Sequence, residues 1–383
     1  MSVRGLISAN ASARGELVLS ESNLEDFARG AAFLGTGGGG DPYLGRLMAK
    51  NAIREFGSPR IIGVDELSDD ATVAFVAMMG APTVLCEKGA SGDDIDCAVQ
   101  ELSAQIGRPI DALMPGEIGG FNSTLPVVAA ARLGLPLVDV DGMGRAFPSI
   151  AMVAMNFEGV SACPFVLVDD HLNKVVVKAD TAQRTEDISR SIAVQMGMSC
   201  LTAGYAMSGA DVKHATVHNT LSAALQIGEA IREGRKAGDP VRALIHVLET
   251  HPIYGFAREV FSGKITDLRR ETTKGFSIGN CRIEAFDDAS CAADIRFQNE
   301  NLVVLVNGVV NAIVPDLITI VDVETAEPIP TEALRYGQRV SVIAAAAPDA
   351  LKTPQALAYV HPRCFGLDFE FTPIEVLAEA ARA

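Results

Sequence analysis

The sequence has no run of basic residues. Its 32 lysines and arginines are outnumbered by 48 aspartates and glutamates, which gives a formal net charge of −16. Proteins that bind nucleic acid neutralise its phosphates with clustered Lys and Arg side chains. The charge balance of this chain therefore argues against a nucleic-acid partner.

Long apolar runs and cysteine pairs are also missing. No uninterrupted apolar stretch reaches the about 18 residues that a membrane-spanning helix needs. The first residues, MSVRGLISANASARGELVLS, lack the apolar segment of a secretory signal. The seven cysteines are an odd number and form no C-x-x-C pair. These absences predict a cytoplasmic protein with free thiols, and neither a membrane protein nor a disulfide-stapled one.

Strands and helices are predicted to alternate in the N-terminal half. Strands are predicted at 60–64, 72–78, 110–114 and 135–140, and helices at 22–34, 41–57, 93–106 and 124–133. Short connections between alternating strands and helices favour a parallel sheet with right-handed crossovers. The carboxyl ends of these strands are then expected to meet at one edge of the sheet.

The C-terminal half follows another pattern. A β-hairpin turns around 169–174, amphipathic helices are predicted near 185–196, 220–236 and 240–250, and short β-rich segments recur from about 255 onward. Such segments are typical of a barrel or sandwich. We therefore predict an α/β N-terminal domain with a parallel sheet (residues 1–175) and a C-terminal domain of helices followed by a largely β region (residues 176–383).

Glycine and charged residues follow three of the predicted N-terminal strands, in the loops 80–92, 115–123 and 139–148. Open α/β sheets bind ligands at the carboxyl ends of their strands, so we expect these loops to line one crevice.

The residue types in this predicted crevice indicate acid–base chemistry. Carboxylates that crowd into a cleft repel one another, which raises a pKa and produces a general base or recruits a metal ion. Asn122 or Ser123 lies where a helix begins, and the backbone N–H groups of that helix start could hold an anion or a polar ligand. The predicted catalytic residues are Glu117, Asn122, Asp139 and Asp141, and the predicted substrate-binding residues of these loops are Glu87, Lys88 and Arg145. The alternative is that Asp139 and Asp141 cap a turn and pair with Arg145.

The segment GTGGGGDP at 35–42 matches G-x-G-x-x-G, but a predicted helix precedes it where the dinucleotide fingerprint needs a strand. No nucleotide is therefore expected. A glycine-rich loop before a helix can cradle an anionic group or let two backbones approach closely. We assign Gly37, Gly38 and Asp41 to substrate binding.

Five segments make the chain resemble a known family. They are FLGTGGGGDPYLG, MMGAPTVLCEKG, MPGEIGGFNSTLPVVAAARLGLPLVDVDGMGRAFP, TLSAALQIGEAI and HPRCFGLDFEFTPIEV, and they span about residues 22–377. The chain resembles the proteins long known as domain of unknown function 917, now the S-methyl thiohydantoin desulfurase family. Its members occur alone or beside hydantoinase/oxoprolinase-type enzymes. The resemblance implies an α/β domain followed by a largely β domain.

The activity that this resemblance implies is hydrolysis of an S-methyl thiohydantoin to a hydantoin with release of methanethiol. The reaction needs an activated water, an acid for the leaving group and a group that holds the ring. A carboxylate or a divalent metal such as zinc would activate the water. Arg145 or Lys88 would bind a carboxylate tail of the substrate.

Candidate ligands for such a metal are His214, His218 and Cys86. The spacing His214-x-x-x-His218 would place two imidazoles on one helical face, but it lacks the glutamate of H-E-x-x-H, and no spacing selects a ligand set. The second hypothesis is a non-catalytic partner subunit of a hydantoinase/oxoprolinase-type enzyme. In either case we expect a small cyclic-amide ligand and a homo-oligomer.

Overall fold

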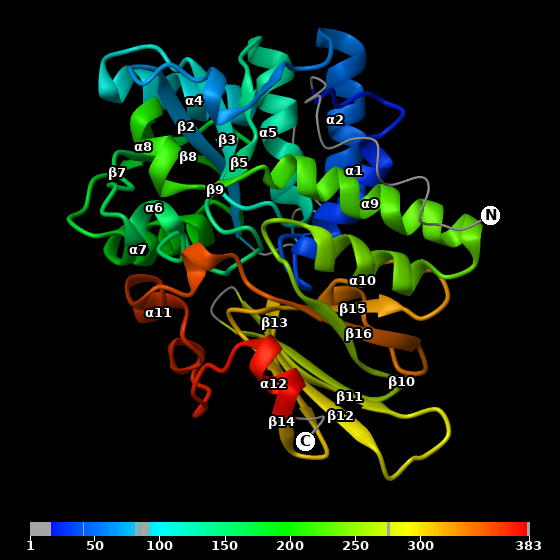
Figure 1. Ribbon diagram of the computed structural model, residues 1–383. Helices are drawn as coiled ribbons and strands as arrows, with labels where there is room; N and C mark the ends of the chain where they lie inside the picture. The colour runs from blue at the N-terminus through cyan, green and yellow to red at the C-terminus, as the bar shows by residue number, and fades with distance from the viewer. Residues whose placement is uncertain (1–16, 41, 81–83, 85–91, 274–275, 381–383) are drawn as a thin grey trace.

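The computed structural model describes residues 17–40, 42–80, 84, 92–273 and 276–380. Within these residues the strands form two seven-stranded sheets and one two-stranded sheet. One large sheet with its surrounding helices lies above the other in Figure 1. The predicted fold class, an α/β N-terminal domain followed by a largely β C-terminal domain, is confirmed.

The first sheet is mixed. Its strands in spatial order are β1 (Ile61–Ile62), β4 (Leu137–Val138), β3 (Ala112–Pro115), β2 (Thr72–Gly80), β8 (Ser199–Ser208), β6 (Phe165–Val168) and β7 (Lys174–Val177). The first four are parallel, as predicted. The other three add antiparallel strands, and β6 and β7 form the predicted hairpin. Because β8 belongs to this sheet, the first sheet extends past residue 175, where the sequence analysis ends the N-terminal domain.

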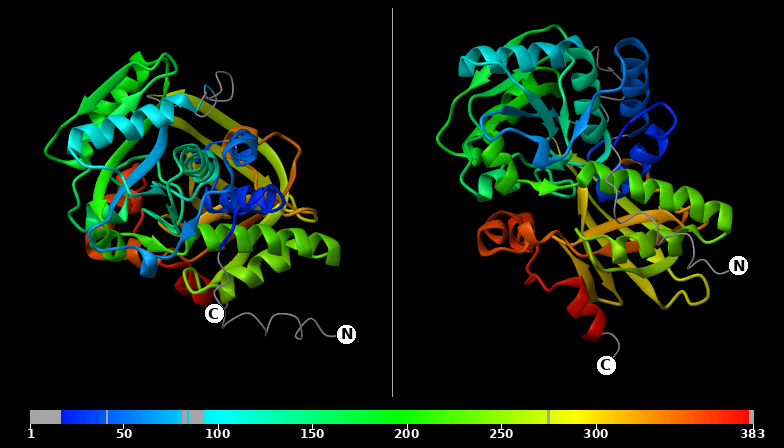
Figure 2. Two further views of the ribbon diagram at one scale, coloured as in Figure 1. Left: turned by 90° about the horizontal axis from the view of Figure 1, so that it is seen from above. Right: turned by 45° about the horizontal axis from the view of Figure 1, so that its top comes forward.

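Helices cover the first sheet on both faces (Figure 2). They include α1 (Leu24–Leu34), α2 (Pro42–Phe56), α4 (Asp93–Ile106), α5 (Gly120–Leu133), α6 (Ala154–Phe157), α7 (Ala182–Gln195) and α8 (Gly209–Ala215). The helix α5 is buried along nearly its whole length, which matches its run of apolar and small residues. It starts directly after the loop that follows β3, so its first turn lies at the carboxyl edge of the parallel strands.

The second large sheet is antiparallel throughout. Its strands in spatial order are β14 (Val309–Ile313), β13 (Glu300–Val306), β12 (Ala292–Gln298), β11 (Phe276–Glu284), β10 (Ala257–Thr273), β16 (Arg339–Ala345) and β15 (Leu317–Asp322). The chain closes with α11 (Pro354–Val360) and α12 (Ile374–Ala380). Of the helices in the described part of the chain, none combines the length and the apolarity that crossing a membrane needs.

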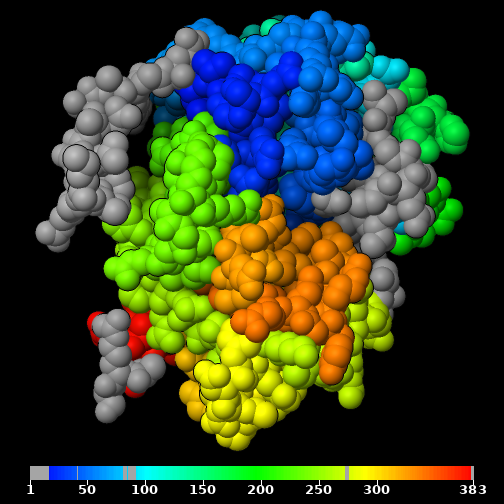
Figure 3. All heavy atoms as spheres, turned by 90° about the vertical axis from the view of Figure 1, so that its right-hand side faces the viewer, coloured from blue at the N-terminus to red at the C-terminus, as the bar shows by residue number. Residues whose placement is uncertain are grey.

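Two further helices, α9 (Thr220–Ala237) and α10 (Pro240–Thr250), lead from the first sheet to the second. The helix α10 covers the predicted range, and Asp239 caps it: its carboxylate accepts from the backbone N–H of Arg242 at 3.2 Å. The N-terminal helices also contact the C-terminal strands directly (Figure 3). There the hydroxyl of Thr319 in β15 donates to the backbone oxygen of Phe33 in α1 at 2.7 Å. The two domains thus share a continuous interface.

The crossing of α1 and α9 is unusually close. A Cβ atom built on Gly30 would lie 1.7 Å from the backbone oxygen of Ala224, and one built on Gly228 would lie 1.8 Å from the backbone oxygen of Asp26. Each helix therefore carries a glycine at the point where the backbone of the other helix passes. This contact anchors α9, whose first residues lie behind the site described next.

Candidate active site

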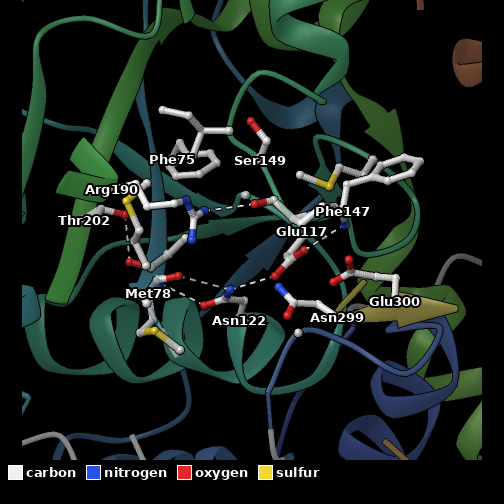
Figure 4. Close-up of a pocket in the computed structure, with 18 residues that line it drawn as sticks. Phe75, Met78, Glu117, Asn122, Phe147, Ser149, Arg190, Thr202, Asn299 and Glu300 are labelled. Carbon is white, nitrogen blue, oxygen red and sulfur yellow. Dashed lines mark hydrogen bonds between the residues drawn. The ribbon is translucent and has the colours of Figure 1, made fainter. Parts of the chain in front are cut away.

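A pocket lies where the carboxyl ends of β2 and β3 face the start of β13 (Figure 4). Its cavity volume is about 80 Å³, and its mouth is open to solvent. Its lining residues are Gly39, Phe75, Ala77, Met78, Met79, Gly80, Gly116, Glu117, Asn122, Met143, Phe147, Pro148, Ser149, Ile150, Arg190, Thr202, Asn299 and Glu300. Both domains contribute, so the pocket exists only when they are packed together.

Glu117 is the central carboxyl group of the pocket. It follows β3 and is 7% exposed. Its Oε1 accepts from Asn122 Nδ2 at 2.7 Å, and its Oε2 accepts from the backbone N–H of Phe147 at 3.2 Å. Burial raises the pKa of Glu117 to about 7, against the opposing effect of these two hydrogen bonds and of the positive charge of Arg145. A carboxyl group with such a pKa exchanges a proton readily at neutral pH.

Asn122 fixes the orientation of that carboxyl group. Its Oδ1 accepts from the backbone N–H of Met78 at 2.8 Å, and its Nδ2 contacts the backbone oxygen of Met78 at 3.4 Å. Because Oδ1 is held by a backbone donor, Nδ2 must point to Glu117. The amide thus links the end of β2, the first turn of α5 and the loop after β3.

Asp139 lies outside the pocket lining and caps α9. Its Oδ1 accepts from the backbone N–H groups of Leu221 at 2.8 Å and Ser222 at 3.1 Å, and its Oδ2 accepts from the hydroxyl of Ser222. These N–H groups belong to the first turn of the helix, where backbone donors lack intrahelical partners. The arrangement is that of a helix cap.

Asp141 is fully buried beneath the loop that carries Glu117. Its Oδ2 accepts from the backbone N–H groups of Ile118 at 2.9 Å and Met143 at 3.1 Å, and its Oδ1 accepts from that of Gly144 at 2.8 Å. Burial raises the pKa of Asp141 to about 7, and the backbone hydrogen bonds oppose this increase. Asp141 is therefore placed to hold the Glu117 loop, and it does not line the pocket.

Arg145 is also fully buried, and it is not among the residues that line the pocket. Its Nη1 donates to the backbone oxygens of Pro315 at 2.7 Å and Asp316 at 2.9 Å, and its Nη2 donates to Thr36 Oγ1 at 2.9 Å. The guanidinium lies 4.3 Å from the centroid of the Phe147 ring, which forms part of the pocket wall. Arg145 thus joins the two domains behind that wall.

Two family models match this chain, one in each half. A model of the S-Me-THD-like N-terminal domain matches residues 22–179, and a model of the S-Me-THD-like C-terminal domain matches residues 179–374. The chain belongs to the S-Me-THD-like family. This confirms the resemblance to the S-methyl thiohydantoin desulfurase family.

A solved structure extends this result. The crystal structure of a protein from Chromobacterium violaceum matches with a TM-score of 0.77 and 25% identity, covering 94% of this chain and 100% of the other. A search of curated proteins finds no match. The two-domain fold of this S-Me-THD-like protein therefore has an experimental counterpart over almost its whole length.

Among the pocket residues of this S-Me-THD-like protein that the sequence reasoning missed, three carry a charged or amide side chain. Asn299 lies between β12 and β13, Glu300 begins β13, and Arg190 comes from α7. The polar letters QNEN at 298–301 interrupt an apolar β-rich segment, and this interruption is the signal that could have drawn attention to the first two. Arg190 stands in an amphipathic helix with no distinguishing pattern.

Arg190 is the only cation among the described residues that line the pocket. Its Nε donates to Glu186 Oε1 at 2.6 Å and its Nη2 donates to the backbone oxygen of Pro148 at 2.9 Å. The guanidinium also lies 4.6 Å from the centroid of the ring of Phe276, which begins β11 in the second large sheet. These contacts hold the guanidinium at the pocket wall.

The glycines of the loop at 35–40 let residues of the C-terminal domain come close to its backbone. A Cβ atom on Gly37 would lie 2.9 Å from Asn301 Nδ2, and one on Gly38 would lie 2.0 Å from Glu300 Oε1. The backbone oxygens of Gly39 and Gly40 face the N–H groups of the first turn of α5 at 3.4 and 3.3 Å. The loop thus caps α5 and packs against the C-terminal domain.

The predicted site residues Asp41, Cys86, Glu87 and Lys88 lie outside the described residues.

The predicted imidazole pair is not on one helix. His214 lies in α8, which ends at Ala215, and His218 lies in the strand β9 (Val217–His218), which pairs with β5 (Val140–Asp141). The helical-face interpretation is wrong because the chain becomes extended between the two histidines. Across the part of the chain that the structure describes, no group of three or more His, Cys, Asp or Glu side chains is arranged to hold a metal ion. Because the candidate ligand Cys86 lies outside the described residues, the zinc stays a prediction, and we assign no step to it.

Proposed function

We propose that this protein is a hydrolase that acts on a hydantoin-like ring and removes methanethiol from an S-methyl thiohydantoin. Membership of the S-Me-THD-like family supports the class of ring. The observation that carries the proposal is Glu117, a buried carboxyl group with a pKa of about 7 that faces the pocket between the domains. A general base is most effective when its pKa lies near the working pH.

The proposed role of Glu117 is to accept a proton from water while that water attacks the ring carbon that bears sulfur. Two hydrogen bonds hold the carboxylate, one from Asn122 and one from the backbone N–H of Phe147. The carboxylate therefore needs little reorganisation before it takes the proton, which favours catalysis.

The rest of the pocket suits a small, mostly planar ring. Figure 4 shows the side chains of Arg190 and Asn299 directed toward the space beside Glu117, where their N–H groups can bind ring oxygen or nitrogen. Met143 and Phe147 supply an apolar wall against which a methylthio group can pack.

Release of methanethiol by the purified chain tests the proposal. Glu117→Gln keeps the size of the side chain and removes the base, so we expect turnover to fall by about 10²-fold or more. Glu55→Gln, the same change at an exposed position of α2, should leave turnover unchanged. A folded wild-type chain that releases no methanethiol would contradict the proposal and favour the hypothesis of a partner subunit for a hydantoinase/oxoprolinase-type enzyme. The predicted partner, the metal and the homo-oligomer remain predictions.

A further inference from the structure

A second carboxyl group reaches the pocket from the other domain. Glu300 is the first residue of β13, is 2% exposed and lines the pocket together with Glu117. Figure 4 shows the two carboxyl groups directed toward the same space, Glu117 from the loop after β3 and Glu300 from the opposite side. Substrate bound between them would contact both.

The surroundings of Glu300 favour a proton on it. Its Oε2 is buried and has no hydrogen-bond partner among the described residues, and its Oε1 faces Gly38, where a Cβ atom would lie only 2.0 Å away. A buried ionised oxygen without a donor is unfavourable, whereas a carboxylic acid can donate its proton to a ligand. Burial and the nearby Glu117 raise the pKa of Glu300, Glu332 acts in the same direction, and Arg145 opposes them.

The other lining residues leave Glu300 as the available acid. Of the described residues that line the pocket, only Glu117, Arg190 and Glu300 carry titratable side chains. A guanidinium does not release a proton near neutral pH. If Glu117 takes the proton of water, Glu300 is the other carboxyl group that these described residues offer as the acid.

We propose that Glu300 is the general acid that protonates the leaving sulfur, so that the reaction uses one carboxyl group from each domain. This role rests on the proposed function. It also makes the docking of the C-terminal sheet onto the N-terminal domain a requirement of the chemistry.

The proposed steps balance as follows. Water oxygen bonds to the ring carbon, its proton passes to the Glu117 carboxylate, and the electron pair of the C=N bond moves to nitrogen. That pair then reforms the C=N bond while the C–S bond breaks, and sulfur takes the proton of Glu300 to leave as methanethiol. The ring product is the hydroxy tautomer of the hydantoin, which converts to the carbonyl form. Transfer of the proton from Glu117 to Glu300 restores the starting state.

Two substrates with different leaving groups test this role. An S-methyl thiohydantoin expels a basic thiolate and needs the acid, whereas its S-(2,2,2-trifluoroethyl) analogue expels a more acidic thiol and needs it much less. For Glu300→Gln we expect methanethiol release to fall by about 10²-fold or more, with release of trifluoroethanethiol close to wild type. Glu259→Gln, at an exposed position of β10, should leave both rates unchanged.

The outcomes separate the two proposals. Equal loss on both substrates in a folded Glu300→Gln variant would overturn the acid role, and so would unchanged release of methanethiol. If the Gln variant does not fold, Glu300→Asp keeps an acid one methylene further back; it should slow only the S-methyl substrate, and equal loss on both substrates would again overturn the role. A wild-type chain inactive on both substrates would overturn the proposed function, and the role of Glu300 with it.

Discussion

Asn122 Nδ2 donates to Glu117 Oε1 at 2.7 Å, while Asn122 Oδ1 is held by the backbone N–H of Met78. This hydrogen bond lowers the pKa of Glu117 and so opposes the effect of burial. Asn122 thereby sets both the direction of the carboxyl group and the fraction of it that is ionised at neutral pH.

Asn122→Ala should therefore shift the pH dependence of turnover. Loss of the donor raises the pKa of Glu117 above its value of about 7. Because the base must be ionised, the rising limb of kcat/KM against pH should move to higher pH, and activity at pH 7 should fall more than activity at pH 9. Ser123→Ala, which removes a hydroxyl that donates to Gly120 within the same helix turn, is the control. A rising limb at an unchanged pH would contradict the role given to Asn122.

Substitution of Asp141 tests whether this residue positions the loop that carries Glu117. Its carboxylate accepts backbone hydrogen bonds from Ile118 and from the turn at Met143 and Gly144. In Asp141→Asn an amide NH₂ replaces one acceptor and faces N–H donors, so we expect a loss of about 1–3 kcal/mol in the free energy of unfolding. Because Ile118 adjoins Glu117, kcat should fall as well.

The control for this variant is Asp169→Asn. Asp169 also accepts backbone hydrogen bonds, from His171 and Asn173 in the β6–β7 turn. The Asp169→Asn variant should lose stability and keep the wild-type kcat. Urea unfolding and methanethiol release measure the two effects. If Asp141→Asn loses stability alone, Asp141 is a structural cap without influence on Glu117.

The alternation of strands and helices was enough to predict where Glu117 and Asn122 meet. Both belong to the loop and helix that follow one parallel strand, and the parallel arrangement places that loop at the edge of the sheet. The same rule placed Asp139 and Asp141 at this edge, but it could not tell a carboxylate that faces the pocket from one that caps backbone N–H groups. That choice depends on the path of the chain after the strand and on the position of α9.

The sequence could not predict that Glu300 lines the pocket, and the cause is different. It reaches the pocket because the C-terminal sheet packs against the glycine-rich loop, and that contact joins residues about 260 positions apart in sequence. Local periodicity carries no information on how two domains dock. Arg145 was misplaced for the same reason, since its acceptors at Pro315 and Asp316 also belong to the second domain.

The crossing of α1 and α9 predicts an unusual effect of a small substitution. At an exposed helix position, Gly→Ala stabilises a protein by about 1 kcal/mol. A Cβ atom on Gly228 would instead lie 1.8 Å from the backbone oxygen of Asp26. Because backbone must move to accept it, Gly228→Ala should destabilise the protein by about 1–3 kcal/mol in urea unfolding. A more stable variant would show that the two helices can move apart without any loss in the free energy of unfolding.

Asp316 predicts how stability depends on pH. This buried carboxyl group accepts from the backbone N–H groups of Ala347 at 2.9 Å and Ile374 at 2.7 Å. Burial raises its pKa to about 7, although these hydrogen bonds oppose the change. In the unfolded chain an aspartate titrates near pH 3.9, so between about pH 4 and pH 7 the folded state binds more protons than the unfolded state.

The contribution of Asp316 to stability is therefore present in full below about pH 4 and is lost as the pH rises through about 7. Asp316→Asn removes this titration, because an amide stays neutral throughout. We expect the difference in Tm between wild type and Asp316→Asn to favour wild type most at pH 4.5 and to shrink steadily up to pH 8. Thermal unfolding at five pH values measures it. A difference for Asp316→Asn that grows with pH would mean that the carboxyl group is ionised in the folded protein and stabilised by its backbone donors.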